Sequence, residues 1–192
     1  MPANQPNPTH DVSPDDIRAI AVQLGREPRG VLRVAYRCPN GEPAVVATAP
    51  RLPDGTPFPT LYYLTHPKLT AAVSRLESLG VMKEMSERVA TDTELAAAYR
   101  AAHEDYLRER DSIESLGTDF SGGGMPDRVK CLHVLAAHSL ARGPGVNPIG
   151  DEAIVLITED DPSLVGTWVP ADWPGCRRPA LLRSTNDAGS SH

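Results

Sequence analysis

The hydrophobic periodicity of this chain changes at Pro67, and that change constrains the fold more than any other feature of the sequence. Before Pro67, apolar and polar residues alternate in short segments such as Leu32–Cys38, a pattern typical of strands with one buried face. After Pro67, apolar residues recur at helical spacing through long segments. Strands followed by helices in this order predict an α+β fold.

The segment before Pro67 predicts a small antiparallel sheet, made of a hairpin and one further strand. The turn residues Pro39–Gly41 separate Leu32–Cys38 from a second apolar run, Val45–Ala47. A proline-rich loop follows, and Leu61–Leu64 supplies the third strand. In this hairpin Cys38 lies on the apolar side.

The other periodic segments predict four or five helices that pack on this sheet, over residues 13–24, 67–79, 82–89, 92–115 and about 126–141. Ser13 suits the N-cap of the first helix, and Thr91–Glu94 matches a capping box before the longest one. The helix over 126–141 is apolar on most sides, so we expect it to be central and buried. The run 153–157 is compatible with a helix or a strand.

The length of the chain, 192 residues, suffices for one domain with a substantial core. We expect that domain over residues 13–173. Residues 1–12 are rich in Pro and Asn, and residues 174–192 are polar and rich in Ser. Both terminal segments are therefore expected to be disordered.

Charge and cysteine content favour a soluble, cytoplasmic protein. The formal net charge is -6, which disfavours nucleic acid and anionic membranes as partners. No apolar run approaches the roughly 20 residues that span a bilayer, and the polar N-terminus does not resemble a signal peptide. Three widely separated cysteines argue against a disulfide framework.

Thiol and imidazole side chains near the ends of the expected elements form the first candidate site, a transition-metal site. Zinc accepts such ligands, and the residues concerned are Cys38, His66, Cys131, His133 and His138. Only Cys131 and His133 are close in sequence, whereas zinc ligands usually come in regularly spaced pairs. The alternative is that the cysteines are small buried apolar residues and that His133 is a hydrogen-bonded core residue.

A glycine-rich segment before the expected central helix is the second candidate, an anion site. Backbone N–H groups and basic side chains could hold a phosphate or nucleotide at a helix N-terminus. The residues concerned are Gly122, Gly123, Gly124, Arg128 and Lys130. No Gly-Lys-Ser/Thr follows, so this is not a P-loop, and the alternative is a flexible connector between helices.

Two more interpretations stay open. Cys131 could act as a nucleophile with His133 or His138 as its base, although no local signature of a cysteine hydrolase is present. The long helix that begins near Asp92 could instead offer a docking face to a partner protein, the alternative being that it simply faces the core.

Several short segments within roughly residues 15 to 155 carry a family resemblance. They are Cys38–Gly41, Phe58–Thr65, Ser74–Glu77, Val129–His133 and Asn147–Gly150. In combination they resemble the bacterial family called domain of unknown function 501. The resemblance implies no established activity. Genes of this family often lie near those of a septum-formation initiator and an exopolyphosphatase-like protein, so the resemblance implies a link to cell division.

This chain departs from the family pattern at two positions that matter for a metal site. The family often has Cys where this chain has His66, which exchanges one good ligand for another. It often has His where this chain has Leu135, so a possible ligand is missing here.

Three functions follow from these observations, and the sequence does not decide whether the protein is an enzyme. The first is a protein that binds a small ligand or a metal such as zinc through a Cys/His pocket. The second is an enzyme acting on a phosphorylated or thiol-reactive substrate through the glycine-rich segment and Cys131. The third is a non-catalytic partner protein linked to cell division.

Overall fold

The fold is built on one four-stranded antiparallel sheet, seen in a computed structural model that describes residues 10–176. The strands follow the order β1-β2-β3-β4, with β1 at His10–Asp11, β2 at Val31–Arg37, β3 at Pro43–Thr48 and β4 at Tyr62–Leu64. Each strand pairs with the next in the sequence, so no connection crosses over another strand, and the connection from β1 to β2 contains the first helix. The expected hairpin and third strand are therefore confirmed.

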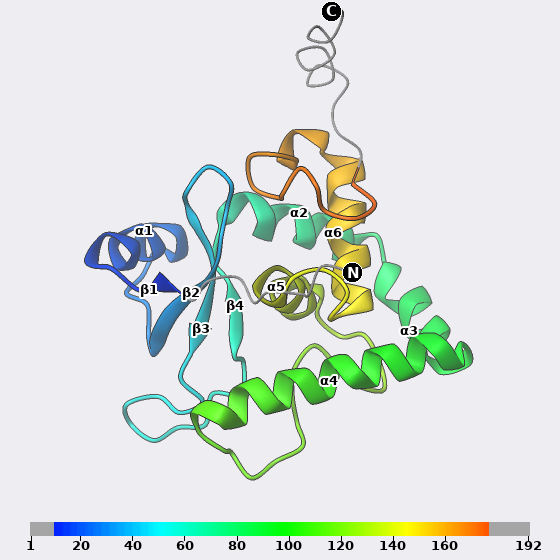
Figure 1. Ribbon diagram of the computed structural model, residues 1–192, viewed down its shortest axis with the longest axis horizontal. Coiled ribbons are helices and arrows are strands. Elements are labelled where there is room, and N and C mark those ends of the chain that lie inside the picture. Colours follow the sequence, from blue (N-terminus) through cyan, green and yellow to red (C-terminus); the bar gives the residue numbers. More distant parts are fainter. Residues whose placement is uncertain (1–9, 177–192) are drawn as a thin grey trace, which may run out of the picture.

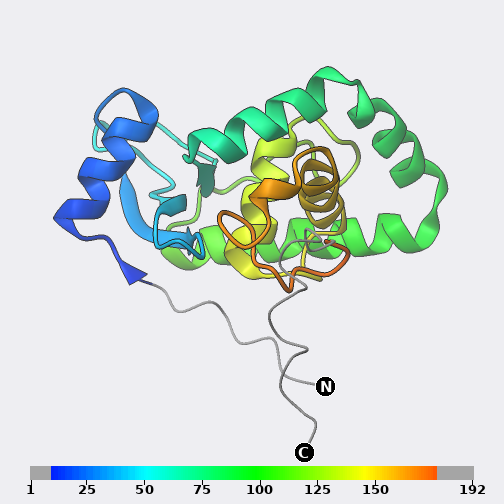
Figure 2. The ribbon, with the colours of Figure 1, turned by 90° about the horizontal axis from the view of Figure 1, so that it is seen from above.

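Six α-helices surround the sheet, and the α+β class expected from the change in periodicity is confirmed (Figure 1). They are α1 at Pro14–Leu24, α2 at Pro67–Ser78, α3 at Val81–Thr91, α4 at Thr93–Ile113, α5 at Leu132–Arg142 and α6 at Pro148–Asp160, followed by a 3-10 turn at Pro162–Leu164. Helix α1 lies on one side of the sheet, while α2 to α6 lie on the other (Figures 1 and 2).

Alternate residues of the central strands separate the two sides of the sheet. Val45 and Tyr62 belong to the main core on the α5 side, whereas Val46 and Tyr63, their chain neighbours, point to the α1 side. Val45 pairs with Leu64 and Val46 with Tyr63, so each face presents its own set of side chains. The central strand β3 is covered on both of its faces, and all six of its residues are buried.

Helix α5 is the central helix, as its apolar sequence predicts. It packs against β4, β2 and β3 on one side and against α6 and α2 on the other. In Figure 1 it is seen almost end-on between the sheet and α6. Leu132 and Leu135 are fully buried, and so are the small residues Ala136 and Ala137, which let neighbouring backbones come close.

Helix α5 begins at Leu132, later than the expected start near residue 126. The backbone N–H groups of the preceding segment are already bonded elsewhere. Lys130 and Cys131 donate to the Gly123 carbonyl, and Val129 donates to the Ser86 hydroxyl. These bonds hold residues 129–131 in an irregular conformation, so they cannot join the helix.

Two other boundaries differ from expectation because side chains compete to cap the helices. Asp92 rather than Thr91 caps α4, since its carboxylate accepts from the N–H groups of Glu94 and Leu95. Thr91 is instead the last residue of α3.

The ambiguous run 153–157 is helical and belongs to α6, the additional helix.

The expected N-terminal arm over residues 1–12 contributes strand β1, because His10 and Asp11 pair with Val34 and Arg33 of β2. The rest of that arm and most of the tail expected over residues 174–192 lie outside the described residues. Within residues 10–176, no helix combines the length and apolar character required to cross a bilayer.

The crossing of α5 and α6 predicts the effect of replacing Gly150 by alanine. A Cβ atom at Gly150 would lie 2.2 Å from the Leu135 carbonyl oxygen and 2.4 Å from the Ser139 hydroxyl oxygen. Gly150→Ala should therefore lower the free energy of unfolding by about 3 kcal/mol, as overpacking does. Helix propensity alone predicts the opposite sign, a gain of about 0.5–1 kcal/mol.

Urea unfolding measures this difference. The matched control is Ala71→Gly on the exposed face of α2, which should cost only about 0.5–1 kcal/mol. An unchanged or more stable Gly150→Ala protein would show that the two helices do not approach so closely.

Candidate metal centre

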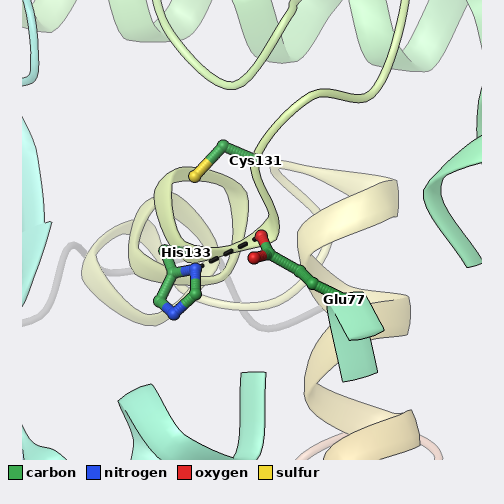
Figure 3. Close-up of side chains that lie close together, drawn as sticks. All are labelled: Glu77, Cys131 and His133. Atoms are coloured by element: carbon green, nitrogen blue, oxygen red, sulfur yellow. Dashed lines mark ion pairs between the residues drawn. The ribbon is translucent and has the colours of Figure 1, made fainter. Parts of the chain in front are cut away.

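A carboxylate, a thiol and an imidazole converge where the C-terminal end of α2 meets the start of α5 (Figure 3). Glu77 lies in the last turn of α2, Cys131 is the N-cap residue of α5, and His133 follows in its first turn. One potential ligand atom from each side chain lies within 4.8 Å of the other two. Among residues 10–176, no other group of three His, Cys, Asp or Glu side chains is this close.

Glu77 reaches this position because α2 is amphipathic and α5 has no cap of its own. Leu69, Val73 and Leu76 hold one face of α2 in the core, which leaves Glu77 at the border of that face. The Cys131 side chain makes no capping hydrogen bond. Instead, Glu77 Oε1 accepts the backbone N–H of Leu132 at 2.7 Å, so α2 supplies the cap of α5.

His133 is held by both of its ring nitrogens. Nδ1 lies 3.2 Å from Glu77 Oε1. Nε2 lies 3.3 Å from the Thr70 carbonyl oxygen and 3.2 Å from the Ser74 hydroxyl oxygen. The Thr70 carbonyl and the Glu77 carboxylate both only accept hydrogen bonds, so the two contacts together favour a proton on each ring nitrogen. Nδ1 is the nitrogen that faces Glu77 and Cys131.

The three groups change one another's protonation. The hydrogen bond with Cys131 raises the pKa of His133, burial opposes this, and the Glu77 charge adds to it. Burial works against ionisation of the Cys131 thiol, but the His133 imidazole and the N–H of Val134 outweigh it, so the pKa of Cys131 is lowered. The site therefore favours a thiolate beside a cation at Nδ1.

All three side chains are half-buried, an environment that excludes most water but still admits a small ion or molecule. Their donors are one sulfur, one nitrogen and one oxygen, each of which zinc accepts. The arrangement can thus hold a proton or a metal ion between Nδ1 and the two acidic groups.

The structure does not bring the other predicted metal ligands, Cys38, His66 and His138, into this group, and the predicted pocket of five residues needs correction. His66 caps the N-terminus of α2, where its Nδ1 accepts the Lys68 N–H, while Glu77 lies near the other end of the same helix. Eleven residues of helix separate His66 and Glu77 by about 16 Å. His66 Nε2 is 3.1 Å from Glu42, a contact that occupies its second nitrogen.

Cys38 fits the alternative of a small buried residue. It is 3% exposed at the end of the β2–β3 hairpin, where its N–H donates to the Glu42 carbonyl. Burial raises the pKa of the Cys38 thiol to about 12, with a smaller contribution from the Glu42 charge. A thiol that stays protonated at neutral pH is a poor metal ligand and a poor nucleophile.

His138 belongs to a separate buried network. Its Nε2 donates to Asp105 Oδ2 at 3.0 Å, and its Nδ1 accepts from the Asn147 side-chain amide at 3.2 Å. The ring stacks on Tyr62 and meets the edge of Tyr106. Burial lowers the pKa of His138, and since both ring nitrogens are occupied, it is a structural residue.

The glycine-rich segment packs against α5 rather than opening as an anion cradle. A Cβ atom on Gly123 would lie 2.6 Å from the Leu135 side chain, and one on Gly124 would lie 2.5 Å from the Arg128 carbonyl oxygen. A Cβ atom on Gly122 would lie 2.9 Å from the Val134 side chain. The three glycines are thus required for the close packing of this segment against α5 and residues 128–131.

The basic residues of that predicted anion site are exposed and precede the helix. Arg128 and Lys130 lie in the turns before Leu132, so neither is on the first turn of α5 as expected. The packing also differs from a flexible connector, because Ser121, Gly122 and Gly123 are buried. The anion site gains no support from this geometry.

Sequence reasoning missed Glu77 because it considered only cysteine and histidine as ligands. A signal was present, since Glu77 ends one of the segments that carry the family resemblance, and Asn147 begins another. The partner of His138, Asp105, had no comparable signal, because it lies 33 positions away on α4.

Comparison with known proteins identifies a family but no relative of known activity. The family model described as protein of unknown function (DUF501) matches residues 34–155, a range that includes Glu77, Cys131 and His133. No curated protein and no solved structure matches the chain.

The buried network predicts a loss of stability at low pH. Burial opposes ionisation of Asp105, but hydrogen bonds from His138 and Arg142 outweigh it and lower the pKa of Asp105 to about 2. The folded state therefore binds the Asp105 proton less readily than the unfolded chain. The resulting stabilisation is complete above the ordinary aspartate range and is lost as the pH falls toward 2.

Asp105→Asn should lower the free energy of unfolding at pH 7 by about 3–5 kcal/mol, as removal of one partner of a buried pair does. Urea unfolding measured between pH 7 and pH 2 should also show that the free energy of unfolding falls less with acid than it does in the parent protein. Asp16, whose pKa is lowered to about 2 chiefly by Arg37, and His138, whose pKa burial lowers, contribute to the acid loss that remains. The exposed Asp172→Asn is the control, and an equal effect there would contradict the assignment.

Proposed function

This chain belongs to the DUF501 family of proteins of unknown function, and we propose that it binds a transition-metal ion, zinc first of all, through Glu77, Cys131 and His133. The observation that carries the proposal is the position of one ring nitrogen. His133 Nδ1 lies 3.2 Å from a carboxylate oxygen, and the Cys131 sulfur lies within 4.8 Å of a potential ligand atom of each of these two residues. A ring nitrogen beside a carboxylate and a thiol favours a proton or a metal ion among the three groups.

The surroundings of the three side chains support a metal ion in that place. Metal-bound histidines usually donate their second N–H to a carbonyl or carboxylate, and the Thr70 carbonyl stands in that position next to Nε2. The N–H of Leu132 likewise fixes Glu77 through Oε1. These contacts orient two of the ligands before any ion arrives, which reduces the entropy lost on binding.

Three protein ligands leave a coordination position for water or a substrate, as in zinc enzymes. Zinc at such a site lowers the pKa of a bound water and polarises a carbonyl or phosphoryl oxygen. The half-buried position of Cys131 and His133 is consistent with access for a small substrate. A metal-dependent hydrolytic activity is therefore the enzyme function that this site supports best.

A second candidate function, thiol chemistry at Cys131, is favoured by the lowered pKa of this thiol and the raised pKa of His133. In the absence of a metal, both shifts act in the direction of a thiolate beside an imidazolium, which is the reactive form of a catalytic cysteine. The two candidates use the same side chains but differ in whether a metal or a proton occupies the centre.

The metal proposal predicts close to one zinc ion per chain in protein purified without chelators. Cys131→Ser and His133→Gln should each lose most of this zinc, because each removes one ligand of three. Elemental analysis measures the zinc. Replacement of zinc by cobalt should also produce a sulfur-to-metal charge-transfer band, which Cys131→Ser abolishes.

The matched controls are Cys176→Ser and His66→Gln, which change a half-buried thiol and a buried imidazole outside the site. Both should keep the zinc. Protein that contains no metal and fails to take up zinc or cobalt in a titration would contradict the proposal.

Alkylation of the cysteines distinguishes the two candidates. In metal-free protein at pH 7, iodoacetamide should modify Cys131 faster than Cys38 or Cys176, because burial raises the pKa of both other thiols. Mass spectrometry of peptides gives the rates. Added zinc should protect Cys131 alone if the metal occupies the site, whereas rapid alkylation that zinc leaves unchanged would favour the thiol function.

A further inference from the structure

A second site lies on the other side of the sheet, in a cavity of about 470 Å³ next to α1. Its floor is the sheet face formed by Val46, Thr48 and Tyr63, and its walls come from two loops. One loop joins α1 to β2, and the other joins β3 to β4. The two loops contribute Arg26, Glu27, Pro28, Arg29, Leu52 and Phe58 to the lining. Leu24, at the end of α1, and Val31, at the start of β2, complete it.

The walls are fixed by the protein's own hydrogen bonds. In the β3–β4 loop, the N–H of Leu52 donates to the Thr56 carbonyl, and the N–H of Phe58 donates to the Pro50 carbonyl. Ala49 donates to Gly30, which ties this loop to the segment after α1. The cavity therefore exists without a ligand, and its volume lies within the roughly 300–1,000 Å³ typical of small-molecule sites.

The lining is apolar and contains two aromatic rings. Phe58 and Tyr63 are both half-buried and both face this cavity. Aromatic residues make up only 5% of the chain, so two of them at one cavity are a notable concentration. Both lie in the segment Phe58–Thr65. Neither belongs to the metal centre or to the main core. Two rings that line one cavity favour a flat apolar ligand.

The rim adds positive charge to this apolar lining. Arg26 and Arg29 are exposed, and the ion pairs found among residues 10–176 include neither. Arg26 donates only to the backbone carbonyl of Glu27, an exposed neighbour. Two arginines and Glu27 give the lining a net charge of +1. The Arg29 charge helps to lower the pKa of Asp54, but neither guanidinium is held in an ion pair, so both are available to bind an anion.

We propose that this cavity binds a small molecule with a flat aromatic body and one anionic group, a carboxylate or a phosphate. The aromatic body lies against Phe58 and Tyr63, and the anion binds Arg26 and Arg29. The site is independent of the metal centre, because α5, which carries His133, packs on the opposite face of the sheet (Figure 1).

The probe for this proposal is anilinonaphthalene sulfonate, an aromatic anion whose fluorescence rises in apolar surroundings. The folded, full-length protein should bind it saturably, with one site per chain. Arg26→Gln combined with Arg29→Gln should weaken binding about tenfold, as loss of a hydrogen bond to a charged group does. Phenylnaphthylamine, which has a similar body without the sulfonate, should bind equally to the parent and the variant.

Three controls make the test specific. Arg18 is an exposed residue of α1 that does not line the cavity, so Arg18→Gln should leave binding unchanged. Leu52→Trp should fill the cavity and abolish binding of both probes. Urea unfolding must show that each variant is folded, because partly unfolded chains also bind the sulfonate probe.

Competition identifies the anion. Displacement of the probe by naphthoate but not by naphthyl phosphate would assign a carboxylate, and the reverse would assign a phosphate. The proposal is overturned if neither competitor displaces the probe, if Leu52→Trp still binds it, or if the double arginine variant binds as tightly as the parent. None of these results depends on whether zinc binds at Glu77.

Discussion

The structure depends on one contact between helices, the acceptance of the Leu132 N–H by Glu77. Helix α5 is the element that the sheet, α2 and α6 all contact, yet its own N-cap residue, Cys131, makes no capping bond. A carboxylate at a helix N-terminus satisfies a free N–H and interacts favourably with the helix dipole. The same contact places Glu77 beside His133, so the feature that positions the central helix also assembles the candidate metal centre.

Periodicity in the sequence predicted the elements well, because it reports which face of each segment is buried. The hairpin, the third strand and the central helix were all expected from it. It could not place the start of α5, since residues 126–131 are as compatible with helix as the residues after them. The N–H groups of Val129, Lys130 and Cys131 are bonded to Ser86 and Gly123, which lie elsewhere in the fold, and only tertiary contacts decide that competition.

The candidate site was predictable in part. Cys131 and His133 were expected as ligands because they are close in sequence and near a helix start. Their partner Glu77 comes from another helix, 54 positions before Cys131 by their residue numbers, and a carboxylate on a helix surface is too common to be recognised as a ligand. Cys38 and His66 have suitable chemistry, but each is committed to a local contact at its own turn or cap.

The two histidines of α5 show what separates a structural imidazole from a potential ligand. His138 has a donor or acceptor partner at both nitrogens, is fully buried and stacks on Tyr62, so nothing is left for it to bind. His133 also has partners at both nitrogens, and each histidine has a carboxylate as one of them. His133 differs in being only half-buried and in having the Cys131 thiol beside it. The thiol, together with access from solvent, makes His133 the one that can take part in chemistry.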